Sequence, residues 1–420
     1  MRITILTVGS LGDVRPYTAL GLGLKKAGHQ VRLATHSPFQ EFVVSHGLDF
    51  VPIEGNPQEL LRGQTGQAWL ESGRNPVRFI RAFLDMFRPF VKQFFADAQE
   101  VCQDADAIVY SLFGFAGFHI AEALGIPSCA AILQPLTRTR AFPLIQLPQR
   151  FNLGGTFNLL THLAGEQLFV QPLISVVNEW RQESLNLPAA PRLNYYGWLY
   201  YEKREPFLYG FSPSVIPKPA DWPAWHYVTG YWFLDQPADW QPPAELVDFI
   251  GGGPPPVYVG FGSMVDKEPE ALTQLILDAL AQAGQRGVLL SGWSDLGSLD
   301  LPDDVLAVDS VPHDWLFPQM AAVVHHGGAG TTAAGLRAGV PSVVAPYFAD
   351  QPFWGERVAA LGVGPPPIPQ KKLTAERLAA GIRTAVGDDA MRARAAALGQ
   401  RIRSEDGVAS AVEIVHRALR

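Results

Sequence analysis

The stretch AAVVHHGGAGTTAAGLRAGVPSVVAP, residues 321–346, contains two short apolar runs joined by a glycine-rich turn and a helix-forming segment. Two histidines end the first run, and two threonines open the helical segment. A Gly-Val-Pro break precedes the second run. Apolar runs of this length, alternating with helices, are typical of parallel strands that are buried on both faces of a sheet. The stretch therefore predicts a β-α-β unit with a right-handed crossover.

Similar units begin elsewhere in the chain. The apolar run at 3–8 leads into GSLGDVRP (residues 9–16), and the run at 257–261 leads into a Gly-Ser turn. The stretch 107–132 repeats the pattern of 321–346, including a Gly-Ile-Pro break. A chain of 420 residues is too long for one ordinary domain. We therefore predict an α/β fold of two tandem Rossmann-like domains.

Composition narrows the class of protein. The chain is 47% hydrophobic and 17% charged, with a net charge of −7, so it lacks the basic character of a nucleic-acid-binding protein. Cys102 and Cys129 form neither a disulfide framework nor a metal pattern, which favours a reducing compartment. The sequence has no signal-peptide pattern and no apolar run of about 18 residues. We expect a cytoplasmic protein without a nucleic-acid partner.

The glycine-rich turn has the chemistry of an anion site. Free N–H groups and a partial positive charge at a helix N-terminus bind phosphate-like groups, and small residues leave room for them. The residues that supply this turn are Gly328, Ala329, Gly330 and Thr331. After the next strand, Asp350 and Gln351 offer a carboxylate and an amide, which suit adjacent hydroxyls. Both segments follow strands of one sheet, so we expect them at its ligand-binding edge.

The earlier turn, GSLGDVRP, carries an acid instead. It does not match the G-x-G-x-x-G fingerprint of dinucleotide sites, and a carboxylate there would repel a phosphate. Asp13 could accept a proton from a substrate hydroxyl as a general base, or it could cap the following helix. The residues alone leave both interpretations open.

These motifs together resemble a known family. VPHDWLF (residues 311–317), the stretch 321–346 and DQPFWGERV (residues 350–358) resemble the nucleotide-sugar-binding segment of sterol 3-β-glucosyltransferases. GSLGDVRP resembles the same family and the related antibiotic glycosyltransferases. The resemblance implies the type B fold, in which two Rossmann-like domains face each other across a cleft. The expected divisions are an acceptor domain at 1–220, a UDP-sugar domain at 221–395, and a C-terminal helix at 396–420 that packs back on the first domain.

The resemblance assigns contacts to the UDP-sugar diphosphate and base. It implies that the backbone of the glycine turn holds the diphosphate and that His325 contacts a phosphate. His326 is the alternative, since adjacent strand residues point to opposite faces. It makes Ser263 a further phosphate contact and the backbone of Val311 a partner of uracil. We add Trp293 as the ring that stacks on the base, because the position that plant relatives use for this is a serine here.

The resemblance also assigns contacts to the sugar of the donor. Asp350 and Gln351 resemble the pair that binds glucose hydroxyls. We assign Ser10 and Gly12, in the early turn, to donor binding as well.

Asp13 matches the position of the catalytic base, where plant relatives carry histidine. A base that deprotonates the acceptor hydroxyl implies a single displacement, so an α-linked donor gives a β-glucoside. The Asp-Ala-Asp at 104–106 precedes a strand, at the wrong edge for a metal-dependent glycosyltransferase motif. We therefore predict neither a metal nor a cofactor.

Phenylalanines recur at helical spacing in RFIRAFLDMFRPFVKQFF, residues 78–95. They are typical of a core stripe, or they line an apolar acceptor pocket. The acceptor contacts that we assign are Phe83, Phe87 and Phe113. Such a pocket suits a flat lipophilic alcohol and is compatible with peripheral contact of the protein with a membrane.

The leading functional hypothesis is an inverting, metal-independent transfer of glucose from UDP-glucose to a hydroxyl of a sterol or terpenoid. A macrolide, carotenoid or phenolic acceptor is an alternative. A sugar-nucleotide epimerase or hydrolase on the same fold is another, which would consume UDP-glucose without an acceptor. The missing G-x-G-x-x-G argues against a nicotinamide oxidoreductase. A non-catalytic binding module would have little need of Asp13.

Overall fold

The chain folds into two compact units. The computed structural model describes residues 1–56, 78, 81–82, 90–236, 240–261, 269–290 and 301–418. The first unit contains residues 1–234 together with 405–420, and the second contains residues 235–404. Each unit is built around one parallel sheet, so the predicted fold class of two tandem α/β domains is confirmed.

The described part of the first unit contains a seven-stranded sheet with the order β3-β2-β1-β4-β5-β6-β7, and every neighbouring pair is parallel. Its strands are β1 (Arg2–Leu6), β2 (Gln30–His36), β3 (Asp49–Ile53), β4 (Ala107–Tyr110), β5 (Ser128–Ile132), β6 (Phe207–Tyr209) and β7 (His226–Val228). Its helices are α1 (Leu11–Lys26), α2 (Gln40–Ser45), α6 (Val91–Cys102), α7 (Ala116–Leu124), α8 (Gly155–Glu183), α9 (Tyr195–Gly197) and α17 (Gly407–Ala418).

The described part of the second unit contains a five-stranded parallel sheet with the order β10-β9-β8-β11-β12. Its strands are β8 (Val257–Gly260), β9 (Gly287–Leu290), β10 (Val305–Val308), β11 (Ala322–His325) and β12 (Ser342–Val344). Its helices are α10 (Ala244–Gly251), α11 (Pro269–Ala283), α12 (His313–Leu316), α13 (Ala329–Ala338), α14 (Gln351–Ala360), α15 (Ala375–Gly387) and α16 (Asp389–Arg403).

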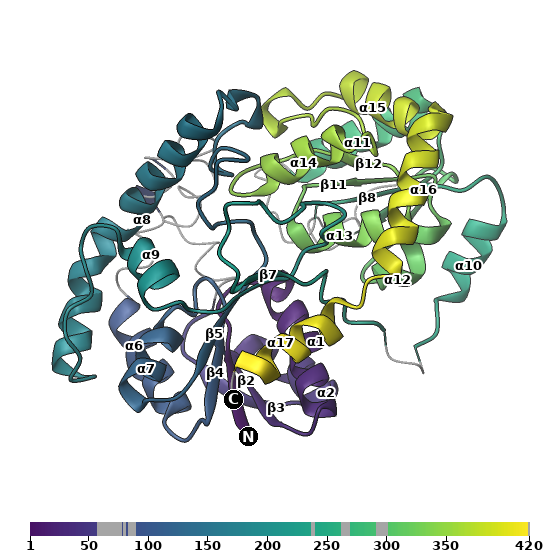
Figure 1. The fold of residues 1–420 in the computed structure, drawn as a ribbon. Helices are drawn as coiled ribbons and strands as arrows, with labels where there is room; N and C mark the ends of the chain where they lie inside the picture. Colours follow the sequence, from purple (N-terminus) through teal and green to yellow (C-terminus); the bar gives the residue numbers. More distant parts are fainter. Residues whose placement is uncertain are drawn as a thin grey trace. The chain divides into compact units, whose positions relative to one another are not determined.

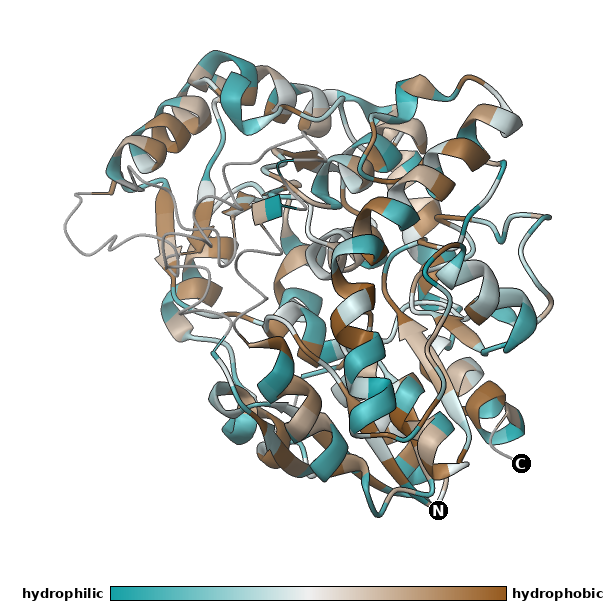
Figure 2. Cartoon of the chain, turned by 90° about the vertical axis from the view of Figure 1, so that its left-hand side faces the viewer, coloured by the Kyte–Doolittle hydropathy of each residue, from teal (hydrophilic) through white to brown (hydrophobic). Residues whose placement is uncertain are grey.

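The strands are apolar because both faces of each sheet are covered. Every residue of β4, β8 and β11 is buried, as is every residue of β1 after Arg2. This burial on both faces explains why these segments are continuous apolar runs and do not alternate. In Figure 2 the helices carry hydrophobic and hydrophilic residues side by side, which fits elements that are buried on one face only. Within the described residues, no helix is both long enough and apolar enough to span a bilayer.

The chain passes between the units at two places. The segment after residue 220 stays in the first unit as far as Leu234, because β7 pairs with β6 and Trp232 is buried in the core. The returning segment 396–404 belongs to α16 and the second unit. Only residues after 404 return to the first unit, where α17 packs against α1 (yellow and purple in Figure 1). The units therefore divide at 234 and 404, whereas the expected divisions were 220 and 395.

Candidate active site

Each sheet has one point at which its strand order reverses. In the first sheet β1 lies between β2 and β4, and in the second sheet β8 lies between β9 and β11. Ligands of open α/β sheets bind outside the carboxyl ends of the strands at such a point. The segments that follow β1 and β4 therefore define one candidate edge, and those that follow β8 and β11 define another.

Asp13 lies at the first of these edges, in the first turn of α1. The Oδ2 atom of Asp13 accepts hydrogen bonds from the Ser10 backbone N–H (2.8 Å) and from the Ser10 hydroxyl (3.1 Å). Ser10 is the N-cap residue and has extended backbone angles, so this is a capping arrangement at the helix start. The helix begins at Leu11, and the expectation that residues 9–16 form one turn is therefore wrong.

Gly9 makes the approach of Asp13 possible. Its φ is +147°, and a Cβ built on it would lie 2.3 Å from Asp13 Oδ2. Any larger residue would displace the carboxylate. Gly12 is exposed, and a Cβ there would meet only the Ser10 hydroxyl, at 3.5 Å. Phe113 is half-buried in the segment after β4, at the same sheet edge as Asp13, because β4 pairs with β1.

The glycine turn lies at the second edge. Gly328 is the N-cap residue of α13, and its carbonyl oxygen accepts from both the backbone N–H and the hydroxyl of Thr332 (2.9 Å each). The first N–H groups of a helix have no carbonyl partner within it, and here they belong to Ala329, Gly330 and Thr331. A Cβ built on Gly330 would have no neighbour within 4 Å. The turn therefore presents backbone donors and open space together.

The two histidines before this turn are neutral. His325 is fully buried, and its Nδ1 accepts a hydrogen bond from the Gly327 N–H (3.0 Å), which assigns the proton to Nε2. No described group bonds Nε2. Burial, with His326 and His313 nearby, lowers the pKa of His325 to about 3. Burial lowers the pKa of His326 to about 4, and a Cβ on Gly328 would clash with its ring.

Asp350 ends the loop after β12, which neighbours β11, and Gln351 is the first residue of α14. Asp350 Oδ2 accepts from Trp354 Nε1 (2.8 Å), and Gln351 Oε1 accepts from the backbone N–H groups of Tyr347 (2.9 Å) and Phe348 (3.3 Å). Gln351 is buried, and its two hydrogen bonds to backbone N–H groups stabilise the loop. The preceding Ala349 has a φ of +55°, a strained conformation of the kind that clusters at functional sites.

The remaining predicted contacts divide into two groups. The Val311 side chain is buried in the core of the second unit, after the edge strand β10, which leaves its backbone for a ligand role. Four candidates lie outside the described residues: Ser263, Trp293, Phe83 and Phe87. In the part of the chain that the structure describes, no three His, Cys, Asp or Glu side chains gather as a metal site requires.

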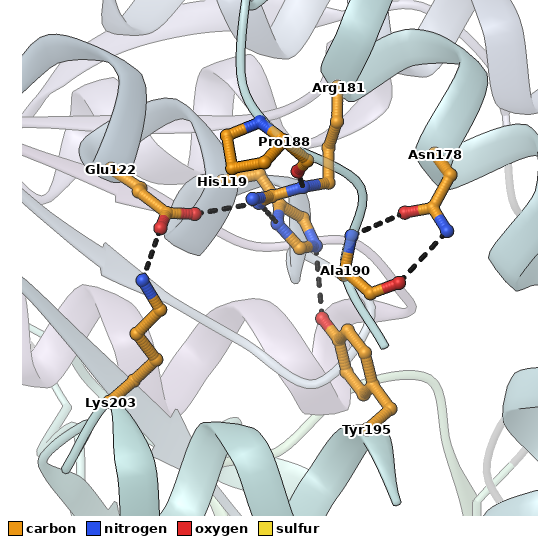
Figure 3. Close-up of polar contacts among 8 residues, drawn as sticks. All are labelled: His119, Glu122, Asn178, Arg181, Pro188, Ala190, Tyr195 and Lys203. Atoms are coloured by element: carbon orange, nitrogen blue, oxygen red, sulfur yellow. Dashed lines mark hydrogen bonds and ion pairs between the residues drawn. The ribbon is translucent and has the colours of Figure 1, made fainter. Parts of the chain in front are cut away.

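The first unit contains a buried polar cluster that was not predicted from the sequence (Figure 3). Arg181 of α8 is almost fully buried, and it donates to Glu122 (2.7 Å), to His119 Nδ1 (2.7 Å) and to the Pro188 carbonyl (2.9 Å). The other ring nitrogen of His119 bonds the Tyr195 hydroxyl at 3.0 Å. Burial, with the Arg181 charge beside it, holds the pKa of His119 well below its usual value.

This cluster ties α7, α8 and α9 together, since its members come from all three helices. His119 lies 62 positions before Arg181 and 76 before Tyr195 in the chain. No local pattern in the sequence could have identified it. We assign it a structural role.

Two family profiles match the chain. The profile for the glycosyltransferase family 28 N-terminal domain matches residues 3–143, and that for the erythromycin biosynthesis protein CIII-like C-terminal domain matches residues 275–418. The first match falls within the first unit, and the second falls within the second unit apart from α17. Both units have a candidate ligand-binding edge where the strand order of the sheet reverses. The fold and these matches make the chain similar to the class of two-domain, type B glycosyltransferases.

Within this class, the chain resembles the sterol 3-beta-glucosyltransferases over its whole length. It is 42% identical to that of Emericella nidulans over 431 aligned residues and 41% identical to that of Neurospora crassa over 438. All of this chain is covered, but only 30% and 27% of those relatives. The chain therefore spans less than a third of the length of the curated relatives that it matches.

Solved structures share the fold. The kitacinnamycin glycotransferase aligns with a TM-score of 0.71 at 23% identity, and the calicheamicin glycosyltransferase CalG4 aligns with 0.70 at 20%. Each comparison covers the whole of this chain and nearly all of the other, 99% and 98% respectively. At these identities the likeness concerns the fold alone, and it agrees with the type B architecture predicted from the sequence.

Proposed function

We propose that this chain is an inverting, metal-independent glycosyltransferase that moves glucose from UDP-glucose to a hydroxyl of a lipophilic acceptor such as a sterol or terpenoid. The observation that carries the proposal is the placement of complementary chemistry at the two sheet edges, a carboxylate at one and a helix N-terminus at the other. The 42% identity to sterol 3-beta-glucosyltransferases supports the glucosyl donor and the sterol-like acceptor.

In the proposed reaction Asp13 is the general base. Its carboxylate takes the proton of the acceptor hydroxyl as the acceptor oxygen forms a bond to the anomeric carbon. The bond from that carbon to the phosphate oxygen breaks, and UDP leaves with the electron pair. One displacement inverts the configuration, so α-linked glucose becomes a β-glucoside. The capping bonds to Oδ2 hold the Asp13 carboxylate in place at the sheet edge.

The α13 N-terminus stabilises the leaving diphosphate in this proposal. Its backbone N–H groups and the helix dipole favour the negative charge that develops on UDP. His325 supports this role, because its tautomer leaves a protonated Nε2 that can donate to a phosphate oxygen. The protein's own donors thus supply the charge stabilisation, and we propose that neither a metal nor a separate cofactor takes part.

The substitution Asp13→Asn tests the base. It keeps the size of the side chain and an oxygen acceptor for the Ser10 cap. We expect glucosyl transfer to fall by about 10²- to 10⁴-fold with little change in UDP affinity, since a general base contributes about that factor. Transfer is measured with labelled UDP-glucose and UDP binding by calorimetry. Turnover close to that of the native chain would remove Asp13 as the base.

A panel of acceptors tests the substrate class. Sterols, terpenoids, flavonoids and macrolides are each incubated with labelled UDP-glucose, and a reaction without acceptor serves as control. We expect transfer to a sterol or terpenoid and no consumption of UDP-glucose alone. Consumption without acceptor would point to an epimerase or hydrolase, and transfer to none of the acceptors with intact UDP binding would refute the proposal.

A further inference from the structure

The first half of α8 is amphipathic in the reverse of the usual sense. Its inward face is polar: Asn158, His162 and Glu166 have exposed fractions of 1%, 0% and 6%. Its outward face is apolar, although helices of globular proteins normally turn the apolar side to the core. An exposed apolar surface of this kind marks a site of interaction.

The segment 138–144 keeps the polar face of α8 inward. Asn158 Nδ2 donates to the Arg140 carbonyl (2.9 Å), and His162 Nε2 bonds the Phe142 carbonyl (3.1 Å). The Glu166 carboxylate accepts from Arg138 through both oxygens, at 3.1 Å and 2.5 Å. These buried bonds fix the rotation of the helix, since turning it would leave each polar group without a partner. The apolar face is therefore held toward solvent.

The outward face, here called the α8 apolar face, consists of Phe151, Leu153, Phe157 and Leu160. Their exposed fractions are 43%, 68%, 36% and 57%. Leu153 lies just before the N-cap Gly154 of α8. Phe157 and Leu160, three positions apart within α8, lie on one side of the helix. Four large apolar side chains within ten positions lie in contact with water.

The charge around this face favours an anionic partner. Residues 135–178 contain three arginines and one glutamate, a formal charge of +2, whereas the whole chain carries −7. The glutamate is Glu166, which is buried and paired with Arg138. Arg140 and Arg150 are exposed, and the Arg150 guanidinium lies 5.3 Å from the centre of the Phe151 ring.

Asp221 also contacts this segment. Its carboxylate accepts from the Thr139 hydroxyl and the Arg140 N–H, both at 2.6 Å. These bonds engage the Asp221 carboxylate with the Thr139 side chain and the Arg140 backbone, and they leave the Arg140 guanidinium out of this contact. Large apolar groups flanked by arginines are the composition of an interfacial membrane anchor.

We propose that the α8 apolar face, with Arg140 and Arg150, docks this chain on an anionic phospholipid surface. The apolar side chains enter the boundary between headgroups and acyl chains, and the two guanidinium groups pair with lipid phosphates. The inference deepens the proposed function, because a lipophilic acceptor dissolves in that surface. The binding itself requires no catalysis, so it is testable even if the glycosyltransferase proposal fails.

Vesicle co-sedimentation tests the docking surface. The native chain is mixed with phosphatidylcholine vesicles that contain phosphatidylserine, and bound protein is measured against vesicle concentration. The double substitution Leu153→Gln, Leu160→Gln is expected to lower the partition coefficient by about tenfold or more for each leucine withdrawn from the lipid. Both side chains are exposed, so the melting temperature should stay unchanged. Val44→Gln, on α2 with an exposed fraction of 53%, is the matched control.

A separate variant tests the contribution of charge to vesicle binding. Arg150→Gln is expected to weaken binding by about fivefold at low salt, since one basic residue near such a surface contributes about 1 kcal/mol. High salt should abolish the difference between this variant and the native chain. Equal binding of all variants, or equal loss in Val44→Gln, would overturn the proposal.

Two further measurements separate other occupants of the face. With the acceptor delivered in cyclodextrin and without vesicles, the double variant should keep the native kcat/KM. A parallel loss there would mean that these leucines line the acceptor site. If size-exclusion chromatography shows that the leucines hold two copies of the chain together while vesicle binding is unaffected, the face is a dimer interface, and the proposal is wrong.

Discussion

At the scale of single residues, glycines set the shape of both candidate edges. Gly9 is required because its φ of +147° and the nearby Asp13 carboxylate leave no space for a Cβ. Gly327 is required for a similar reason, with φ of +91° and Val344 at 2.7 Å from a built Cβ. Gly330 differs from both, because nothing in the protein crowds it. That difference allows structural and binding roles to be separated by experiment.

Gly9→Ala is expected to lower glucosyl transfer by displacing Asp13. The control is Gly28→Ala, since Gly28 also has a positive φ (+91°) but no atom within 4 Å of a Cβ. Both variants should lose about 1 kcal/mol of stability from backbone strain. Only Gly9→Ala should lose turnover, by about tenfold or more. Equal turnover in the two variants would show that Asp13 need not lie where Gly9 allows it.

Gly330→Ala is expected to weaken UDP binding without destabilising the fold. Its added methyl group points into open space, and alanine favours a helix over glycine by up to about 1 kcal/mol. A phosphate held at this turn would lose hydrogen bonds worth about 1.5–3 kcal/mol each, and so about tenfold or more in affinity. Calorimetric titration with UDP and thermal denaturation measure the two effects. Gly387→Ala, another uncrowded glycine at a helix end, should change neither by much.

At the scale of elements, the structure decided features that the sequence left open or did not indicate. The segment 9–16 was expected to be a turn, yet residues 11–16 belong to α1, because Ser10 and Asp13 cap a helix that starts at Leu11. Pro16 lies within that helix. In α8 the inward face is polar because the neighbouring segment supplies partners for it. Both cases depend on contacts that side-chain periodicity does not reveal.

Gly407→Ala is expected to loosen α17 from the first unit. A Cβ there would lie 2.3 Å from the Tyr231 carbonyl oxygen and 2.6 Å from the Gly230 carbonyl carbon. Such overpacking costs about 1–3 kcal/mol, measured as a lower free energy of unfolding in denaturant. Gly251→Ala, at the uncrowded end of α10, is the control and should stay near the native value. Unchanged stability of Gly407→Ala would mean that α17 shifts without cost.

At the scale of the whole molecule, buried ionisable groups link folding to pH. Burial raises the pKa of Glu205 to about 7, although the Ser128 hydroxyl donates to its carboxylate at 2.8 Å. Burial lowers the pKa of His162 to about 4 and that of His226 to about 3. The folded chain therefore binds a proton at Glu205 that the unfolded chain releases. Conversely, His162 and His226 stay unprotonated in the folded chain at pH values at which the unfolded chain protonates them. Stability is reduced on both sides of neutrality.

Glu205→Gln is expected to stabilise the fold at high pH. The stabilising protonation of the native glutamate is present below about pH 4.5 and is lost as the pH rises through about 7. Glutamine carries no such dependence, so the variant should gain up to about 3 kcal/mol at pH 8 relative to pH 4. Denaturant unfolding at both pH values measures this, with the exposed Glu183→Gln as control. A gain that does not depend on pH would contradict the assignment.

The sequence by itself determined the two α/β domains, the order of strand, turn and helix at 321–346, and the family resemblance. It could do so because apolar runs and glycine turns are local and periodic, and they encode parallel strands and tight helix starts directly. It also placed Asp13 and the glycine turn after strands. Their roles as base and diphosphate site stay predictions.

Only the tertiary structure decided which groups these residues meet. In the structure, Asp13 accepts hydrogen bonds from Ser10 and lies close to Gly9. The Gln351 side-chain oxygen accepts from the preceding loop, and buried His325 accepts one hydrogen bond at Nδ1. The tertiary structure also buried Arg181 with His119 and turned the apolar side of α8 outward. The contacts of Arg181 and of the polar face of α8 join segments distant in the chain, and the neutral state of His325 arises from desolvation on burial. Neither distant contacts nor desolvation can be deduced from the spacing of residues along one segment.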